Sequence, residues 1–135
     1  MLFQRKILKS IELFINTDEI IVIHGARQVG KTSLLQLIIE KFNLRNYAYF
    51  DLEDFRFLEL FEQGVDKVVN HIENRFDIDK NKKFYVLIDE IQYLSNPSSF
   101  LKIFHDHYKW FKLIVSGSSS FDIKKNLKIH WLEEQ

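Results

Sequence analysis

Cysteine is absent from this chain of 135 residues, proline occurs once, and glycine occurs only four times. Without cysteine the chain can form neither a disulfide framework nor a thiolate metal site, and this composition fits a reducing compartment. With so little proline and glycine, the chain has no long low-complexity linker either. These absences favour one compact domain, because a chain of this length supports one hydrophobic core and not two ordinary ones.

The chain also lacks a net charge and a long apolar run. Nineteen basic residues balance nineteen acidic ones, so no overall field attracts nucleic acid or a membrane surface. No segment approaches the roughly 18 apolar residues that span a bilayer. The N-terminal stretch "MLFQRKILKSIELFI" mixes basic with apolar residues and has no small-residue cleavage site. We therefore expect a cytoplasmic protein without a membrane partner, and a nucleic-acid partner is not indicated.

What the sequence does contain is a regular alternation of two patterns. Short apolar runs that are typical of buried strands occupy residues 20–23, 47–50, 84–88 and 113–115. Segments with apolar residues three and four positions apart precede and separate these runs, which predicts helices. This alternation indicates an α/β fold, in which helices flank both faces of a parallel sheet. Ligands of such sheets bind at the carboxyl ends of the strands.

Two helix boundaries can also be predicted. The helical region after the second apolar run is interrupted at Gln63 and Gly64, because glycine weakens a helix. Ser98 or Ser99 is expected to cap the helix that precedes the fourth run.

The stretch "GARQVGKT", residues 25–32, matches the pattern G-x-x-x-x-G-K-[ST] in full. It lies between the first strand and a helical segment, which is the order that a phosphate-binding loop requires. Glycines let successive backbone N–H groups point at phosphate oxygens, and the following helix adds the positive end of its dipole. The residues expected to bind the nucleotide are Gly25, Ala26, Arg27, Gln28, Val29, Gly30, Lys31, Thr32 and Ser33.

Two side chains of this loop have specific expected roles. Lys31 would reach the β- and γ-phosphates and take part in catalysis, and the Thr32 hydroxyl would coordinate Mg²⁺. The alternative interpretation is a surface turn with an exposed lysine, which the flanking strand and helix make less favourable.

Acidic and hydroxyl residues follow the third and fourth strands. In "FYVLIDE", Asp89 would hold Mg²⁺ directly or through water, and Glu90 would act as the base that activates water. An acidic pair after an apolar strand is by itself more often a surface cap, but the phosphate loop favours the functional interpretation. In "VSGSSS", Ser118 is the first choice and Ser116 the second for a hydroxyl that binds the γ-phosphate or the attacking water. A serine-rich helix start is the alternative there.

Four stretches taken together, "GARQVGKTSLL", "YFDLED", "LIDEIQ" and "IVSGSSS", make residues 1 to about 125 resemble one family. It comprises the archaeal and bacterial AAA-type ATPases that typically carry an uncharacterised C-terminal domain. The resemblance implies a P-loop ATPase core with strand order 5-1-4-3-2. It also implies the usual roles for Lys31, Thr32, Asp89, Glu90 and a serine of the fourth strand.

The chain departs from that family at its end, "NLKIHWLEEQ", where family members continue into a fifth strand and a further domain. Residues 1–135 are therefore expected to form a single P-loop ATPase domain without that strand and without the C-terminal domain. Leu127, Ile129 and Trp131 alternate with polar residues at the period of a strand, so the tail could replace the fifth strand beside residues 20–23. A continued helix and a second copy of the chain are the open alternatives.

The expected function is Mg²⁺-dependent binding of ATP and its hydrolysis to ADP and phosphate. A nucleotide-binding switch or partner-binding fragment without useful turnover is the second hypothesis. No arginine follows Arg75, whereas AAA-type ATPases normally place catalytic arginines after the acidic pair, and this favours the second hypothesis. Arg27, Arg45, Arg56 and Arg75 could act only from a neighbouring subunit of a homo-oligomer. A small-molecule phosphotransferase is disfavoured, because Glu90 would activate water beside the γ-phosphate.

Overall fold

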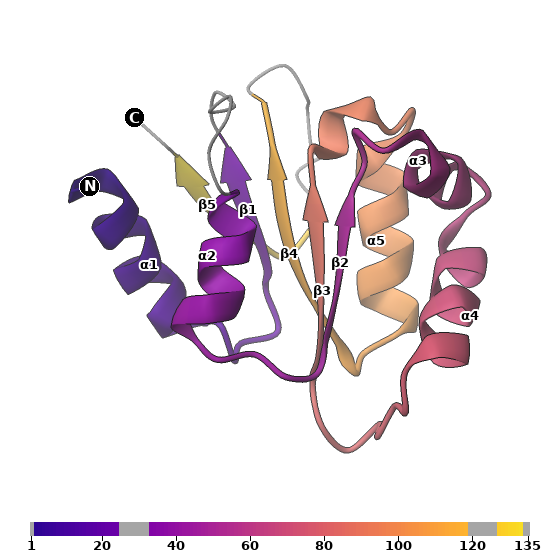
Figure 1. The fold of residues 1–135 in the computed structure, drawn as a ribbon, viewed down its shortest axis with the longest axis horizontal. Coiled ribbons are helices and arrows are strands. Elements are labelled where there is room, and N and C mark those ends of the chain that lie inside the picture. The colour runs from indigo at the N-terminus through magenta and orange to yellow at the C-terminus, as the bar shows by residue number, and fades with distance from the viewer. Residues whose placement is uncertain (1, 25–32, 119–126, 134–135) are drawn as a thin grey trace.

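A computed structural model of the protein describes residues 2–24, 33–118 and 127–133. Figure 1 shows a central sheet with helices on both sides. In chain order the elements are α1 (Leu2–Phe14), β1 (Ile20–His24), α2 (Leu34–Lys41), β2 (Tyr47–Asp51), α3 (Phe55–Glu62), α4 (Val65–Arg75), β3 (Phe84–Asp89), the 3₁₀ helix η1 (Ile91–Tyr93), α5 (Pro97–His107), β4 (Phe111–Gly117) and β5 (Ile129–Glu133).

The five strands are all parallel and lie in the order β2-β3-β4-β1-β5. Counted from the other edge this is 5-1-4-3-2, so the predicted fold class and strand order are confirmed. The central strands β1, β3 and β4 are buried along most of their length, as expected for parallel strands that helices cover on both faces.

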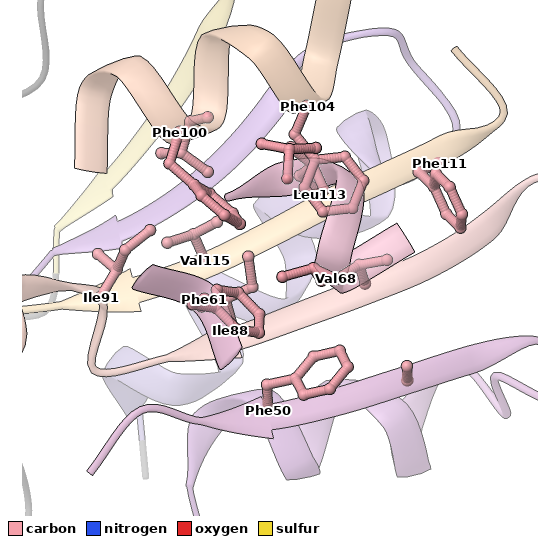
Figure 2. Close-up of a cluster of buried hydrophobic side chains, with 14 of the residues drawn as sticks. Phe50, Phe61, Val68, Ile88, Ile91, Phe100, Phe104, Phe111, Leu113 and Val115 are labelled. Atoms are coloured by element: carbon pink, nitrogen blue, oxygen red, sulfur yellow. The ribbon is translucent and has the colours of Figure 1, made fainter. Parts of the chain in front are cut away.

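Helices α3, α4 and α5 cover one face of the sheet, here termed the α3–α5 face. Phe61 of α3, Val68 of α4 and Phe104 of α5 belong to one buried cluster with Phe50 and Ile88 of the sheet (Figure 2). Aromatic rings meet edge to face here, as between Phe104 and Phe111 with centroids 5.4 Å apart, an arrangement that phenyl rings favour. Much of the chain's phenylalanine is therefore used in this core.

Helices α1 and α2 cover the opposite face, the α1–α2 face (Figure 1). Ile11 of α1 and Leu35 and Ile38 of α2 are fully buried there, against Leu87 of β3 and Ile114 of β4. Neighbouring residues of a strand point to opposite faces. The face of each polar residue at a strand end therefore follows from that of its apolar neighbours.

The two predicted helix boundaries have different outcomes. Between α3 and α4, Gly64 adopts a left-handed backbone with φ of 108°, so the predicted interruption is confirmed. The predicted cap of α5 is wrong: Asn96 occupies the N-cap position and Pro97 the first turn. Proline suits the start of a helix because its missing N–H needs no partner there, and it places the start before Ser98.

The expectation that the chain lacks a fifth strand is also wrong. Residues 129–133 form β5, which pairs with β1 from Ile20 opposite Ile129 to His24 opposite Glu133. On the α1–α2 face, His130 stacks on Phe14 of α1 with ring centroids 3.5 Å apart. The tail therefore covers β1 in the way that its alternating pattern allowed, and neither a continued helix nor a second copy takes that place.

A buried lysine ties the connection between α1 and β1 to the sheet. Lys112 of β4 is only 2% exposed, and its ammonium donates hydrogen bonds to the carbonyls of Phe14 (2.8 Å), Thr17 (2.7 Å) and Glu19 (2.5 Å). Burial lowers the pKa of Lys112 to about 8. These carbonyls compensate for the desolvation of the charge.

Removal of residues 126–135 is expected to lower Tm and to cause self-association, because β1 would become an open apolar edge. Thermal unfolding and light scattering would measure both effects. The full-length variant Lys128→Ala is the control, since this side chain is exposed and forms an ion pair of 3.6 Å with Asp18. A truncated chain that stays monomeric and equally stable would show that β5 contributes nothing to the fold.

Candidate functional site

The candidate site lies at the carboxyl edge of the sheet, where parallel strands all end. β1 ends there at His24, β3 at Asp89 and β4 at Gly117. Residues 25–32 connect β1 to the start of α2. Eight of the nine residues predicted to bind nucleotide, including Lys31 and Thr32, thus lie outside the described residues. Ser33 is the one that the structure describes.

Ser33 forms the N-cap of α2. Its hydroxyl accepts a hydrogen bond from the Leu35 N–H (3.1 Å), and its own N–H donates to Gln36 Oε1 (3.2 Å), which completes a capping box. The positive end of the α2 dipole consequently faces the carboxyl edge of the sheet, a position that favours an anion.

Asp89 is held in place by two hydroxyl groups from the neighbouring strands. The Tyr49 phenol of β2 donates to Asp89 Oδ2 at 2.6 Å, and the Ser116 hydroxyl of β4 donates to Oδ1. Tyr49 packs with the α1–α2 cluster, and Asp89 and Ser116 point the same way because they alternate with Leu87 and Ile114. The three side chains therefore form a row across β2, β3 and β4 on the face that α2 covers.

The electrostatics of this row keep Tyr49 a hydrogen-bond donor. Burial raises the pKa of Tyr49 well above its ordinary value, and the hydrogen bond and negative charge of Asp89 raise it further, while the Ser33 hydroxyl acts in the opposite direction. A carboxylate can accept about four hydrogen bonds or metal bonds. Two donors thus orient Asp89 and leave acceptor capacity for a cation.

Glu90 follows in a left-handed backbone conformation, with φ of 60° and ψ of 49°. This region is uncommon for a residue with a side chain and often marks a functional site. The Glu90 N–H donates to the Ser116 hydroxyl at 3.3 Å, and the residue is only 8% exposed. Its carboxylate accepts a hydrogen bond from Gln92 Nε2 at 3.0 Å.

Ser116, near the end of β4, and Ser118, directly after the strand, have different partners. Ser116, the second choice, reaches Asp89 because the pairing of Ile88 with Val115 brings the next residue of each strand side by side. Ser118, the first choice, donates its backbone N–H to Gln92 Oε1 at 3.1 Å. Sequence reasoning missed Tyr49 and Gln92, although both belong to stretches that carry the family resemblance.

The donors at this edge fit the metal that the sequence predicts. Mg²⁺ prefers oxygen ligands and is usually held by one or two carboxylates together with substrate phosphates, and Asp89 can supply such an oxygen. The described part of the chain contains no group of three or more His, Cys, Asp or Glu residues that could hold a metal without phosphate. In the same part of the chain, no helix is long and apolar enough to cross a bilayer.

Comparison with known proteins gives a match to one family model, described as "AAA domain", over residues 17–131. Two relatives come from Methanocaldococcus jannaschii. The uncharacterized protein MJ1544 is 29% identical over 119 residues, which cover 88% of this chain and 25% of that protein. The uncharacterized protein MJ1637 is 29% identical over 132 residues, which cover 92% of this chain and 27% of that protein. The chain thus spans about a quarter of the length of these relatives.

Tyr49→Phe should lower the free energy of unfolding by about 1.5 kcal/mol, because a half-buried carboxylate loses a hydrogen-bond donor. Urea denaturation measures this loss. Tyr85→Phe is a matched control, since the Tyr85 hydroxyl donates to the neutral side chain of Asn16 at 3.1 Å and its loss should cost less. Equal losses for the two variants would contradict a special role of the bond between Tyr49 and Asp89.

Proposed function

The chain belongs to the AAA domain family, and from this membership and the Asp89 row we propose that it binds ATP with Mg²⁺ and hydrolyses it. Membership indicates a nucleotide-binding, ATPase-like function. The observation that carries the finer proposal is the Asp89 carboxylate, fixed by Tyr49 and Ser116 at the carboxyl edge of the sheet. An oriented carboxylate at the edge of the sheet where α2 begins suits a metal-bound triphosphate.

Binding would use residues 25–33, which connect β1 to α2. Backbone N–H groups of this segment would surround the phosphates, and Lys31 would contact the β- and γ-phosphates. Thr32 and Asp89 would hold Mg²⁺, which when bound neutralises phosphate charge and positions the γ-phosphate. The hydroxyls of Tyr49 and Ser116 would keep Asp89 oriented toward that metal.

Hydrolysis would use Glu90 as the general base. The hydrogen bond from Gln92 to its carboxylate supports this proposal, in which Glu90 would take a proton from the water that attacks the γ-phosphate. Lys31 would stabilise the charge on the transferring group, and the Ser118 hydroxyl would contact the γ-phosphate or the water. The Ser116 hydroxyl donates to Asp89 and would act by orienting that carboxylate.

A second candidate function is a nucleotide-dependent switch with little turnover. It is favoured for residues 1–135 by themselves, because residues 76–135 contain no arginine and an arginine finger contributes about a thousand- to a hundred-thousand-fold in rate. In a homo-oligomer, Arg27, Arg45, Arg56 or Arg75 of a neighbouring copy could provide such an arginine.

We further propose that residues 1–135 act as one P-loop ATPase domain in the cytoplasm, with ATP and ADP as ligands.

Calorimetry with Mg·ATP should show binding by the wild-type chain and loss of most affinity in Lys31→Ala. The matched control is Lys67→Ala, which changes an exposed lysine of α4.

Glu90→Gln should keep ATP affinity and reduce hydrolysis at least about a hundredfold, because the amide cannot accept the proton. Equal ATP affinity of wild type and Lys31→Ala would refute the phosphate loop. Binding without turnover by the wild type would support the switch.

A further inference from the structure

Gln92 joins the ends of two strands through one side-chain amide. It lies in η1, directly after Glu90 and Ile91. Its Nε2 donates to Glu90 Oε1 at 3.0 Å, and its Oε1 accepts from the Ser118 N–H at 3.1 Å. One planar group therefore contacts both the proposed general base and the residue proposed to face the γ-phosphate.

The chemistry of these contacts determines which way the amide points. The Ser118 backbone N–H can only donate a hydrogen bond, so the Gln92 oxygen must face it. A carboxylate oxygen of Glu90 accepts hydrogen bonds, so it requires the NH₂ group. Glutamine provides both functions at this distance, whereas glutamate would lack the donor and leucine would lack both.

The contact to Ser118 is not needed to hold β3 and β4 together. The two strands already pair from Phe84 opposite Phe111 to Ile88 opposite Val115. Beyond this ladder, Ser116 joins Asp89 and the Glu90 N–H. η1 itself is fixed by fully buried Ile91. The strand pairing at this edge therefore does not depend on Gln92. Its two hydrogen bonds instead position Glu90 and Ser118 relative to each other.

We propose that Gln92 is a positioning residue that couples the γ-phosphate end of the site to the orientation of Glu90. This inference rests on the proposed function. A triphosphate that contacts Ser118 would fix the position of this residue at the end of β4. Because the Gln92 amide binds both the Ser118 N–H and the Glu90 carboxylate, it would in turn fix the orientation of that carboxylate. ADP lacks the γ-phosphate and would not engage this link. Gln92 would therefore contribute to the preference for ATP over ADP and to the placement of the base.

Two variants of Gln92 separate its two contacts. Gln92→Leu removes both hydrogen bonds. Gln92→Glu keeps an acceptor for the Ser118 N–H but loses the donor to Glu90 and places two carboxylates together. Gln63→Leu is the matched control, because Gln63 is exposed at the end of α3 and its amide contacts only a backbone carbonyl, that of Glu59 at 3.4 Å. Thermal unfolding would check that all three variants fold.

Calorimetry with Mg·ADP and with a non-hydrolysable Mg·ATP analogue is the main measurement. Gln92→Leu should bind the analogue about tenfold more weakly, as expected when the hydrogen bond to the Ser118 N–H no longer supports the contact with the γ-phosphate, and bind ADP within about twofold of wild type. Gln92→Glu should keep much of the preference for the analogue. In single-turnover hydrolysis with excess protein, Gln92→Glu should be slowed at least as strongly as Gln92→Leu, and neither variant should slow Glu90→Gln further.

Several outcomes would overturn the inference. If Gln92→Leu binds ADP and the analogue with wild-type affinity, or if both affinities fall by the same factor, Gln92 does not contribute to the preference for a γ-phosphate. This result leaves the proposed function intact as long as the wild-type chain binds nucleotide and Lys31→Ala does not. A wild-type chain that binds neither ADP nor the analogue would refute the proposed function itself, and the role of Gln92 with it. If the wild type binds ATP but does not hydrolyse it, the affinities of the wild type and Gln92→Leu for ADP and the analogue are sufficient to test the role of Gln92.

Discussion

The carboxylate of Asp89, held between the hydroxyls of Tyr49 and Ser116, is the interaction on which the candidate site depends. A carboxylate at the end of a buried strand would otherwise be a mobile surface charge. Here one donor comes from each neighbouring strand, so its position is set by the parallel register of the sheet. Glu90 is placed in turn, since its N–H bonds the same Ser116 hydroxyl and its left-handed backbone directs the chain into η1.

The core explains why this edge of the sheet is well defined. Leu87 and Ile88, the residues before Asp89, are fully buried on opposite faces, and Ile91 is fully buried after it. Close packing on both sides leaves little freedom for the intervening residues. At the other end of the sheet, Lys112 anchors the connection between α1 and β1, and β5 covers the outer side of β1. The apolar strands and the polar site are thus parts of one arrangement.

The general architecture was predictable because its signals are local. Apolar runs, helical spacing and the glycine-rich motif identify strands and helices within a few residues, and the family resemblance adds the strand order. The start of α5 was missed because proline at position 97 outweighs the capping tendency of Ser98. The buried role of Lys112 was missed because a lysine next to "LIV" normally marks the end of a strand, and its carbonyl partners in residues 14–19 are distant in sequence.

The contacts within the site depend on register, which the sequence does not show. Whether Ser116 or Ser118 reaches Asp89 follows from the alignment of β4 with β3. The contact of Tyr49 follows from the position of β2 on the other side of β3. The amide of Gln92 can join Glu90 to Ser118 only because η1 contacts β4. Residue types and spacing lead to a hypothesis about the roles of Asp89 and Glu90, but they do not indicate the side chains that contact these two residues.

The most direct test of the account is a crystal structure with a non-hydrolysable ATP analogue and Mn²⁺ in place of Mg²⁺, with the metal located by its anomalous scattering. The account predicts one ion between the Asp89 carboxylate and the β- and γ-phosphates, with Tyr49 and Ser116 still bonded to Asp89. An ion or nucleotide bound away from the carboxyl edge of the sheet would contradict the central claim that Asp89 is the metal-binding residue of a nucleotide site.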